Sequence, residues 1–498
     1  MSQIAVNHLT FAYDGSYDNI FDDVSFRLDT DWRLGLTGRN GRGKTTLLRL
    51  LMGQLDGGGS IAAPGVRFAY FPYPVTGTER TAAEVVLDAV PELELWQLLK
   101  EMAGLGLEED VLERVYATLS SGEQTKLLLA ALFSGEERFL LIDEPTNHLD
   151  QAGRALTGDY LRKKRGFILV SHDRAFLDRC IDHLLVMERS RVLVRQGSFS
   201  SWWQDKQQQD ALERRQNEKL QQEIRRDQAA ARRAESWSGQ VEKELTSGKN
   251  AASGLHIDKG FVSHKAAKAM KRAKNIQHRA EAAQAEKEEL FKNVESSQPL
   301  KLHPLEYHSN RLLELREVSP VYDGRAVCRP VSFQLCRGER VALRGSNGCG
   351  KSSLLNLICG APLDHTGTVQ VGSGLVISRV RQETAHLHGT LDELVQAQGV
   401  DGTLFKTILR KLDLTRLMLE KPMEQYSEGQ KKKVLLALSL SQSAHLYVWD
   451  EPLNFIDVFS RIQIEELLKT YVPTLLFVEH DAAFCDAIAT RTVELEAL

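Results

Sequence analysis

The segment Gly38-Arg-Asn-Gly-Arg-Gly-Lys-Thr-Thr46 decides the fold, and a second copy follows as Gly345-Ser-Asn-Gly-Cys-Gly-Lys-Ser-Ser353. Each copy stands between a strand-like apolar segment and an apolar segment with helical character. The pattern G-x-x-x-x-G-K-[ST] in this context is a phosphate-binding loop. Its glycines let backbone N–H groups point at phosphate oxygens, and the following helix adds the positive end of its dipole.

Other motifs repeat at the same distance along the chain. From Lys44 to Lys351, from Ser120 to Ser427 and from Asp143 to Asp450 the offset is 307 residues, and from His172 to His480 it is 308. A repeat of this length is a whole domain rather than a solenoid unit. The sequence therefore predicts a tandem duplication.

Short uninterrupted apolar runs alternate with helical segments in both copies. The runs are 139–142, 167–170, 446–449 and 475–478. Such runs are typical of parallel strands that are buried on both faces, so we expect an α/β fold. The repeat stops near 199 and resumes near 301, which predicts a first nucleotide-binding domain at 1–198, a linker at 199–300 and a second domain at 301–498.

Acidic and imidazole side chains follow these runs. We expect Asp143 and Asp450 to lie at the carboxyl edge of the sheet, where ligands of open α/β sheets bind, and to hold Mg²⁺. Glu144 and Glu451 follow at once and are suited to polarise the water that attacks the γ-phosphate. Capping of the next helix is the simpler interpretation of Asp-Glu-Pro, but it does not account for two copies at matched distances from a phosphate loop.

The remaining catalytic and metal candidates belong to the same two sites. His172 and His480 each end a buried strand, where a neutral imidazole could hydrogen-bond the γ-phosphate and sense its loss; a purely structural histidine is the alternative. Lys44 and Lys351 would meet the β- and γ-phosphates. Thr45 and Ser352 would ligate Mg²⁺ through their hydroxyl groups.

Composition excludes several classes of protein. The 498 residues are 42% hydrophobic, enough for real cores, and the six cysteines form no C-x-x-C pair, which indicates a reducing, cytoplasmic environment. No signal peptide is evident at the start, and no apolar run reaches the ~18 residues of a membrane helix. Net charge is −4, yet residues 205–300 hold 19 Lys and Arg against 15 Asp and Glu, so basic charge gathers in the linker.

The two phosphate loops, the segments Leu119-Ser-Ser-Gly-Glu123 and Tyr426-Ser-Glu-Gly-Gln430, the Asp-Glu-Pro strands and the paired histidines resemble ABC-type ATPases. In that family the Ser-x-Gly loop of one domain closes over ATP held by the other. The resemblance implies ATP and Mg²⁺ as cofactors and a monomer that sandwiches ATP within one chain. Tyr13 and Tyr322 match the aromatic residue that stacks on adenine; packing within a strand is the alternative.

The resemblance gives two sets of ATP-binding residues. The first set is Tyr13, Gly38, Arg39, Asn40, Gly41, Arg42, Gly43, Lys44, Thr45, Thr46, Ser427 and Gly429. The second set is Tyr322, Gly345, Ser346, Asn347, Gly348, Cys349, Gly350, Lys351, Ser352, Ser353, Ser120 and Gly122. The residues expected to hold the metal are Thr45, Asp143, Ser352, Gln382 and Asp450.

The two copies depart from each other at two positions. Gln382 stands where the family places a glutamine that touches Mg²⁺ and the attacking water, whereas Tyr73 occupies that position in the first copy. Glu428 replaces a usual glycine in the loop that would face the first site. We therefore expect the Lys44 site to hydrolyse ATP more slowly than the Lys351 site.

The segment Pro145-Thr-Asn-His-Leu-Asp150 resembles the ABC-F class, which acts on ribosomes. The segments His264-Lys-Ala-Ala-Lys-Ala-Met-Lys-Arg-Ala-Lys274 and Trp449-Asp-Glu-Pro-Leu-Asn454 resemble the antibiotic-resistance ABC-F proteins of the Lsa type. This resemblance implies a ribosomal protection protein that binds the ribosome at the tRNA exit site. It would contact rRNA, and the linker would reach toward the peptidyl-transferase centre and dislodge lincosamide, pleuromutilin and streptogramin A antibiotics. Contact with P-site tRNA is a further possibility.

Two other functions stay open. One is a housekeeping ABC-F translation factor that acts on stalled ribosomes. The other is the tandem ATPase subunit of an importer, although those subunits lack a long charged insert between their halves. The spacing of 47 residues from Tyr73 to Ser120 is close to the 45 from Gln382 to Ser427, so we do not expect the arm found in many ABC-F proteins. Because nothing follows Leu498, we do not expect a C-terminal extension either.

The linker is expected to form an antiparallel helical hairpin, with helices from about 202 to 235 and from about 262 to 296 and a tip loop at about 236–260. Its second helix carries a basic run without acidic residues, suited to RNA phosphates, although a solvated helix face is the simpler interpretation. The basic residues are Lys265, Lys268, Lys271, Arg272, Lys274 and Arg279. The apolar or aromatic residues expected at the tip are Trp237, Leu255, His256, Ile257 and Phe261.

Overall fold

The computed structural model describes residues 2–13, 19–90, 93–135, 138–147, 149–188, 191–246, 268, 271, 300–322 and 324–498. The chain divides into two compact units. One is formed by Met1–Ser200 together with Ser297–Leu498, and the other by Ser201–Ser296. The first unit contains both copies of the repeat.

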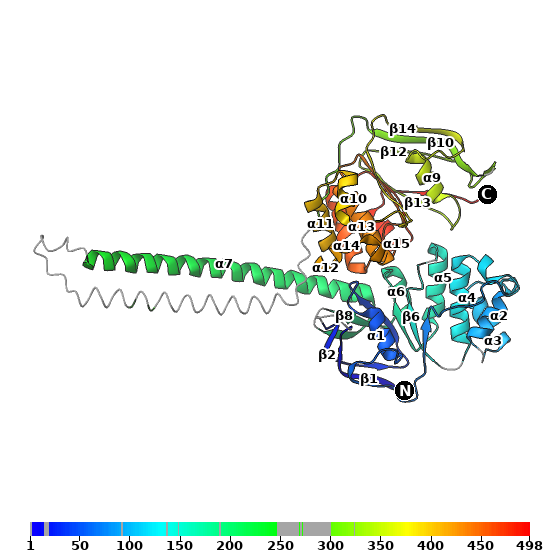
Figure 1. Cartoon of the computed structure of the whole chain (residues 1–498), viewed down its shortest axis with the longest axis horizontal. Helices are drawn as coiled ribbons and strands as arrows, with labels where there is room; N and C mark the ends of the chain where they lie inside the picture. The colour runs from blue at the N-terminus through cyan, green and yellow to red at the C-terminus, as the bar shows by residue number, and fades with distance from the viewer. Residues whose placement is uncertain are drawn as a thin grey trace, which may run out of the picture. The chain divides into compact units, whose positions relative to one another are not determined.

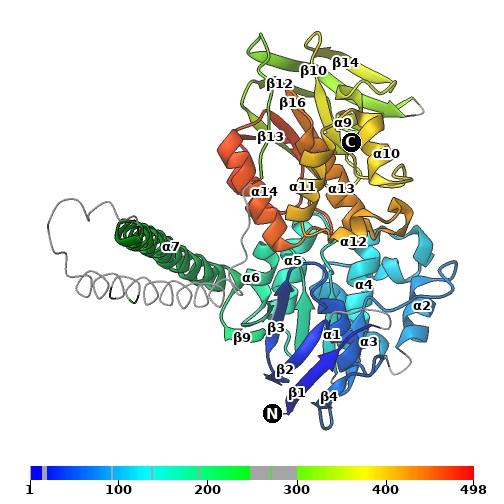
Figure 2. The same ribbon diagram turned by 60° about the vertical axis from the view of Figure 1, so that its left-hand side comes forward.

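The first copy is built on a six-stranded sheet with the spatial order β5-β6-β7-β3-β8-β9, and Figure 1 labels β6 and β8 of this sheet. All neighbouring strands are parallel except β8 and β9. The bounds are β3 Arg33–Gly38, β5 Phe68–Phe71, β6 Phe139–Asp143, β7 Phe167–Val170, β8 His183–Met187 and β9 Val192–Gln196. A separate antiparallel sheet joins β1 (Gln3–Phe11), β2 (Phe21–Asp29) and β4 (Gly58–Ala62), and Figure 2 shows it near the N-terminus.

The second copy repeats this plan. Its parallel sheet has the order β15-β16-β17-β13-β18, which matches β5-β6-β7-β3-β8 strand for strand. The bounds are β13 Arg340–Arg344, β15 Ile377–Val380, β16 Leu446–Asp450, β17 Leu475–Val478 and β18 Arg491–Glu494. The antiparallel sheet consists of β10 (Arg311–Tyr322), β11 (Arg325–Ala326), β12 (Val331–Cys336) and β14 (His365–Val371). The expected α/β fold with two parallel sheets is thus confirmed.

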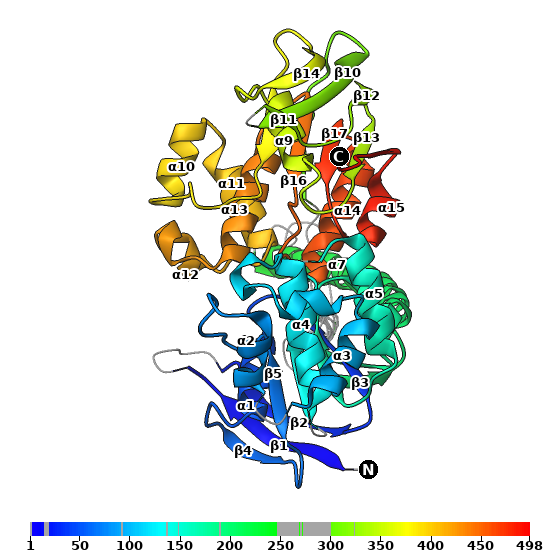
Figure 3. The ribbon, with the colours of Figure 1, turned by 90° about the vertical axis from the view of Figure 1, so that its right-hand side faces the viewer.

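Helices cover the sheets and form a helical subdomain in each copy (Figure 3). In the first copy they are α1 Lys44–Leu51, α2 Ala82–Ala89, α3 Leu95–Gly104, α4 Ser121–Ser134, α5 Gln151–Arg162 and α6 Arg174–Cys180. In the second copy they are α9 Lys351–Ile358, α10 Leu391–Gln398, α11 Gly402–Lys411, α12 Arg416–Leu419, α13 Glu428–Ser441, α14 Val458–Tyr471 and α15 Ala482–Ile488. Short 3₁₀ turns at Glu109–Leu112, Tyr116–Thr118 and Met423–Gln425 lead into α4 and α13.

The linker begins with α7 (Phe199–Thr246), a single helix of 48 residues. It continues eleven residues beyond the expected end near 235, so the expected tip loop cannot begin at 236. The segment Ser236-Trp-Ser-Gly239 is poor in helix formers, but one glycine costs a helix only about 1 kcal/mol. The following residues 240–245 are mostly good helix formers and continue the helix. Within the described residues, no helix combines the length and apolar composition needed to cross a membrane.

Most of the expected second linker helix lies outside the described residues. Lys268 and Lys271 are helical and exposed, whereas Lys265, Arg272, Lys274 and Arg279 are not described. Of the expected tip, Leu255, His256, Ile257 and Phe261 also lie outside the described residues, and Trp237 lies within α7.

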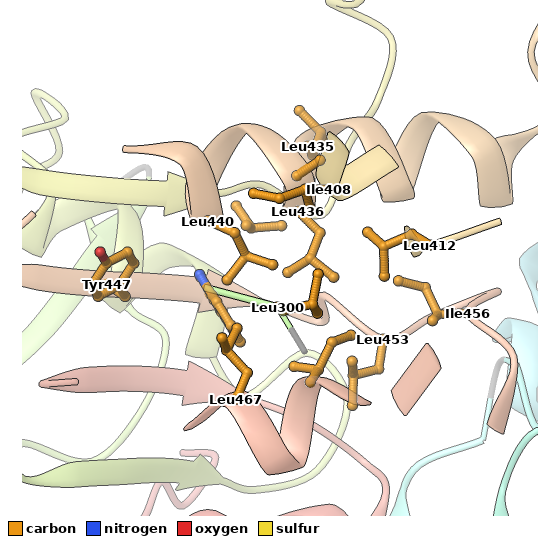
Figure 4. Close-up of a cluster of buried hydrophobic side chains, with 14 of the residues drawn as sticks. Leu300, Ile408, Leu412, Leu435, Leu436, Leu440, Tyr447, Leu453, Ile456 and Leu467 are labelled. Atoms are coloured by element: carbon orange, nitrogen blue, oxygen red, sulfur yellow. The ribbon is translucent and has the colours of Figure 1, made fainter. Parts of the chain in front are cut away.

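The end of the expected linker belongs to the core of the second copy. Leu300 and Leu302 are 4% and 1% exposed and join the cluster that contains Phe405, Trp449 and Phe477. Figure 4 shows Leu300 among the leucine and isoleucine side chains of this cluster. The boundary drawn at 300 from the repeat alone therefore falls inside the second copy's core.

This packing predicts the effect of two leucine substitutions. Leu302→Ala should lower the free energy of unfolding of the second copy by about 2–5 kcal/mol, because it leaves a cavity in a dense core. Leu305, which is 41% exposed, is the matched control, and Leu305→Ala should change that free energy by about 0.5 kcal/mol or less. Calorimetric unfolding measures both, and equal effects would contradict the assignment of this segment to the core.

Candidate functional site

The two phosphate loops have the same local structure. Gly43 and Gly350 precede α1 and α9 with φ angles of 88° and 90°, a left-handed conformation that suits glycine. A Cβ on Gly43 would stand 2.4 Å from the Ile20 side chain, so the close approach also requires glycine. The free backbone N–H groups at the start of each helix then face the space above the loop.

The two loop lysines are held by their own loops. Lys44 Nζ donates to the carbonyl oxygens of Gly38 (2.7 Å) and Arg39 (3.2 Å). Lys351 Nζ donates to those of Gly345 (2.9 Å) and Ser346 (2.7 Å). Burial lowers the pKa of Lys44 from its ordinary value. Phosphate oxygens entering the loop would replace these carbonyl acceptors with stronger, charged ones.

The buried carboxylates end β6 and β16 beside the loops. Asp143 Oδ2 accepts hydrogen bonds from Thr45 Oγ1 (3.0 Å) and from the Tyr70 hydroxyl (2.9 Å). Asp450 is buried, and its Oδ1 has no hydrogen-bond partner among the described residues. Burial raises the pKa of both aspartates, so a cation would compensate both carboxylates. The donor set of one carboxylate and one hydroxyl per site fits Mg²⁺.

Both candidate bases occupy a strained backbone conformation. Glu144 and Glu451 have φ angles of 50° and 46°, the left-handed region that residues other than glycine rarely adopt. Their N–H groups donate to the carbonyl oxygens of Val170 (2.9 Å) and Val478 (3.0 Å) on the neighbouring strand, which holds the turn in place. Strain of about 1–3 kcal/mol of this kind gathers at active sites. It turns the glutamate side chain away from the direction that a continuing strand would give it.

The histidines lie next to these glutamates. Nε2 of His172 is 3.3 Å from Oε1 of Glu144, and Nε2 of His480 is 3.4 Å from Oε1 of Glu451. Burial, with help from the charges of Lys44 and Arg461, lowers the pKa of His172 well below its ordinary value. His172 is therefore a neutral imidazole, as required of a group that reports on a phosphate by hydrogen bonding.

The environments of the two glutamates differ. Gln382 Nε2 and Asn454 Nδ2 donate to Oε2 of Glu451 at 2.9 and 2.6 Å, whereas Glu144 accepts a hydrogen bond from the backbone of His172. Burial, followed by the charge of Asp143, raises the pKa of Glu144 to about 8. Burial acts in the same direction on Glu451, but the hydrogen bond and charge of His480 outweigh it and lower its pKa.

Strand register places Tyr73 and Gln382 at equivalent positions. Phe71 pairs with Ile142, the residue before Asp143, and Val380 pairs with Trp449, the residue before Asp450. Phe71 and Val380 end their strands, so Tyr73 and Gln382 both lie two residues beyond a strand end. The Tyr73 hydroxyl is buried and has no hydrogen-bond partner among the described residues. Tyr73 does not line the cavity described next, whereas Tyr70 does. Tyr70, whose hydroxyl binds Asp143, is a residue that sequence reasoning missed.

The Lys44 loop faces a cavity of about 880 Å³ that both copies line. Lys44, Thr45, Asp143, Glu144 and His172 contribute from the first copy. The second copy contributes Ser427, Glu428 and Gly429, as well as several residues that the motifs did not suggest: Arg410, Asp413, Leu414, Thr415, Met418, Lys433 and Phe455. The structure thus brings together the phosphate loop of one copy and the Ser-x-Gly loop of the other.

The Lys351 side is arranged differently. A cavity of about 370 Å³ beside Ser352, Gln382 and Asp450 is lined, among the described residues, by the second copy alone. Ser120 and Gly122 do not line it. Ser120 and Ser427 are both N-caps, of α4 and α13, and accept hydrogen bonds from the N–H groups of Glu123 and Gln430.

The two tyrosines expected at adenine make matching contacts. The hydroxyl of Tyr13 lies 3.1 Å from Thr46 Oγ1, and that of Tyr322 lies 3.1 Å from Ser353 Oγ. Both rings are exposed beside their loops, where a base could stack on them. In the second loop Cys349 is buried, with its Sγ 4.0 Å from Lys351 Nζ.

Comparison with known proteins agrees with this geometry. The family model described as ABC transporter matches residues 21–147 and 328–454. The chain is 28% identical to the ATP-binding protein Uup of Caulobacter vibrioides, over 96% of this chain and 75% of that protein. It is 28% identical to the ribosome protection protein VmlR of Bacillus subtilis, over 95% of this chain and 84% of that protein. It is 26% identical to ABC transporter F family member 2 of Arabidopsis thaliana, over 99% and 76%.

A solved structure shares the fold of the whole chain. It is an archaeal ribosome recycling factor in complex with a ribosomal stalk protein, and it covers 99% of this chain and 88% of its own with a TM-score of 0.63. The identity is 18%, so this likeness concerns the fold alone.

The different environments of the glutamates predict different pH profiles. In a Glu451→Gln chain only Glu144 can act as a base. Because the pKa of Glu144 is about 8, the rate of ATP hydrolysis should rise roughly fivefold from one pH unit below this pKa to the pKa itself, as the carboxyl ionises. In a Glu144→Gln chain the rate should stay flat between pH 7 and 8, because Glu451 is already ionised there. Identical profiles for the two chains would contradict the assignment.

Proposed function

This chain belongs to the ABC family of ATPases, as an ABC-F protein with two ABC domains that bind and hydrolyse ATP, and we propose that its substrate complex is the bacterial ribosome. In this proposal it binds at the tRNA exit site and dislodges lincosamide, pleuromutilin and streptogramin A antibiotics through its linker. ATP closes the two halves, and hydrolysis releases them.

The residues of the two sites take the following roles in the proposal. Lys44 and Lys351 neutralise the β- and γ-phosphates, and Mg²⁺ bound by Asp143 with Thr45 and by Asp450 with Ser352 adds the positive charge that this reaction needs. Glu144 and Glu451 accept a proton from the attacking water. The histidines donate or lose a hydrogen bond as the γ-phosphate comes and goes.

The observation that carries the ribosome proposal is α7, a 48-residue helix that lies between the two ATPase copies in the sequence. Its length of about 70 Å, at 1.5 Å per residue, suits a lever that transmits closure of the ATPases to a distant site. Exposed Lys268 and Lys271 lie in the following basic segment and are suited to RNA phosphates. The similarity to VmlR supports protection of the ribosome from antibiotics.

A housekeeping ABC-F translation factor is the second candidate. The chain is as similar to Uup, whose name gives only ATP binding, as it is to the ribosome protection protein VmlR. The two roles share the ATPases and the lever and differ in what the linker does at the ribosome. An importer subunit is a third candidate, which the long linker helix argues against.

Ribosome binding is tested with a Glu144→Gln, Glu451→Gln chain, which should bind ATP without hydrolysing it and remain closed. It should co-sediment with ribosomes in ATP. The matched control is Lys44→Ala, Lys351→Ala, which should not, because the loops lose their phosphate contacts. Absence of co-sedimentation of the first chain would contradict any ribosomal role.

Drug protection is tested by expressing the unaltered chain in a sensitive host. Tolerance to lincomycin and to tiamulin should rise, and the Lys44→Ala, Lys351→Ala chain should give no rise. Ribosome binding without a change in tolerance would favour the housekeeping function.

A further inference from the structure

Three polar contacts join the two copies beside the Lys44 cavity. Arg39 Nη1 lies 2.6 Å from Asp413 Oδ2, and Asn40 Nδ2 donates to the Phe455 carbonyl oxygen at 3.0 Å. Arg174 of α6 forms an ion pair with Glu465 of α14. The side chains of both ion pairs are largely shielded from water, with Asp413 the most accessible at 28%, so salt screens them less than surface pairs.

Neither ion pair has a counterpart on the other side of the duplication. At the 307-residue offset Arg39 corresponds to Ser346, and Asp413 corresponds to Gly106. At the same offset Glu465 corresponds to Gly158, and at the 308-residue offset of the histidines Arg174 corresponds to Ala482. Each pair is thus complete on one side, and both of its partners are missing on the other.

One ion pair within each copy does have a counterpart in the other copy. Arg154 Nη1 lies 3.0 Å from Asp173 Oδ2, and at the equivalent positions Arg461 Nη1 lies 2.9 Å from Asp481 Oδ2. Both of these pairs are buried within one copy. This internal pair is thus present in both copies, whereas the one-sided pairs join one copy to the other.

Asp413 occupies a position that suits glycine better than a carboxylate. Its φ angle is 64°, and Gly106 at the equivalent position has 65°, a conformation that favours glycine. Both residues follow a helix C-terminus, α11 and α3, where the helix dipole disfavours a negative charge. The carboxylate gains its stabilisation from Arg39, which is 374 residues away in the sequence.

We propose that the two pairs Arg39–Asp413 and Arg174–Glu465 form a one-sided clasp that keeps the Lys44 site closed on its nucleotide while the Lys351 site opens and exchanges. Arg39 belongs to the phosphate loop itself, so release of nucleotide from this loop and separation of the copies on this side are linked. The Lys44 cavity is lined by both copies, as the clasp requires, whereas the cavity beside Ser352 and Asp450 has its described lining from the second copy alone. The clasp concerns the ATPase and does not depend on the ribosome.

The test measures release of a fluorescent, non-hydrolysable ATP analogue, mant-AMP-PNP with Mg²⁺, from a Lys351→Ala chain in which only the Lys44 site binds. Asp413→Gly installs the residue found at position 106 and relieves the backbone strain, so it removes the carboxylate without disturbing the turn. Release should become roughly tenfold faster, the effect of about one strong charged contact. Arg174→Ala, which installs the residue found at 482, should also accelerate release, although Arg174 does not line the cavity.

Unchanged release in both variants would overturn the proposal, and so would a lower unfolding temperature with unchanged release, since the pairs would then serve the fold alone. The reciprocal experiment builds the first pair on the other side. In a Lys44→Ala chain, Ser346→Arg with Gly106→Asp should slow release from the Lys351 site, and Gly106→Asp alone should not. An unchanged rate in the double variant would contradict the conclusion that the ion pair itself retains nucleotide.

Discussion

The parallel register of β6 with β7, and of β16 with β17, is the constraint on which the rest of the site depends. Asp143 pairs with Val170 and Asp450 with Val478, so the chain must leave one strand just where the neighbouring strand also ends. The N–H groups of Glu144 and Glu451 close this junction by donating to Val170 and Val478. The left-handed turn that results separates the metal-binding carboxylate from the base and brings the base to the histidine of the next strand.

Both copies keep this strand register, and they differ in the residues that surround it. The order of the five shared strands, the capped helices α4 and α13 and the Arg154–Asp173 pair, equivalent to Arg461–Asp481, are the same in both copies. The differences gather around the two glutamates and at the contact between the copies. Glu451 is held by the side chains of Gln382 and Asn454, whereas Glu144 accepts a hydrogen bond from the backbone of His172 and lies in the site that the Arg39–Asp413 pair closes. A base with a raised pKa inside a clasped site favours retention of ATP, and an ionised, oriented base in the other site favours turnover.

Much of this could be predicted from sequence because phosphate chemistry dictates residue types at fixed spacing. The glycines and lysines of the loops, the aspartates at strand ends and the paired histidines follow from local requirements, and the structure places them together around each loop. Sequence could not supply the Tyr70–Asp143 hydrogen bond or the Arg39–Asp413 pair, because both depend on segments far apart in the chain. The helix α7 extends into the expected tip loop at 236–260, because the helix-forming residues 240–245 continue it past Gly239. The tyrosine at position 73 is evident in the sequence, but the burial of its hydroxyl outside the Lys44 cavity depends on the folded structure.

The central claim is that two copies of one ATPase perform unequal work, and single-turnover hydrolysis tests it most directly. Glu451→Gln leaves only the Lys44 site with its base, and Glu144→Gln leaves only the Lys351 site. Measured by rapid quench at pH 7 with limiting ATP, the Lys44 site should hydrolyse more slowly than the Lys351 site. Equal rates in the two chains would contradict the account.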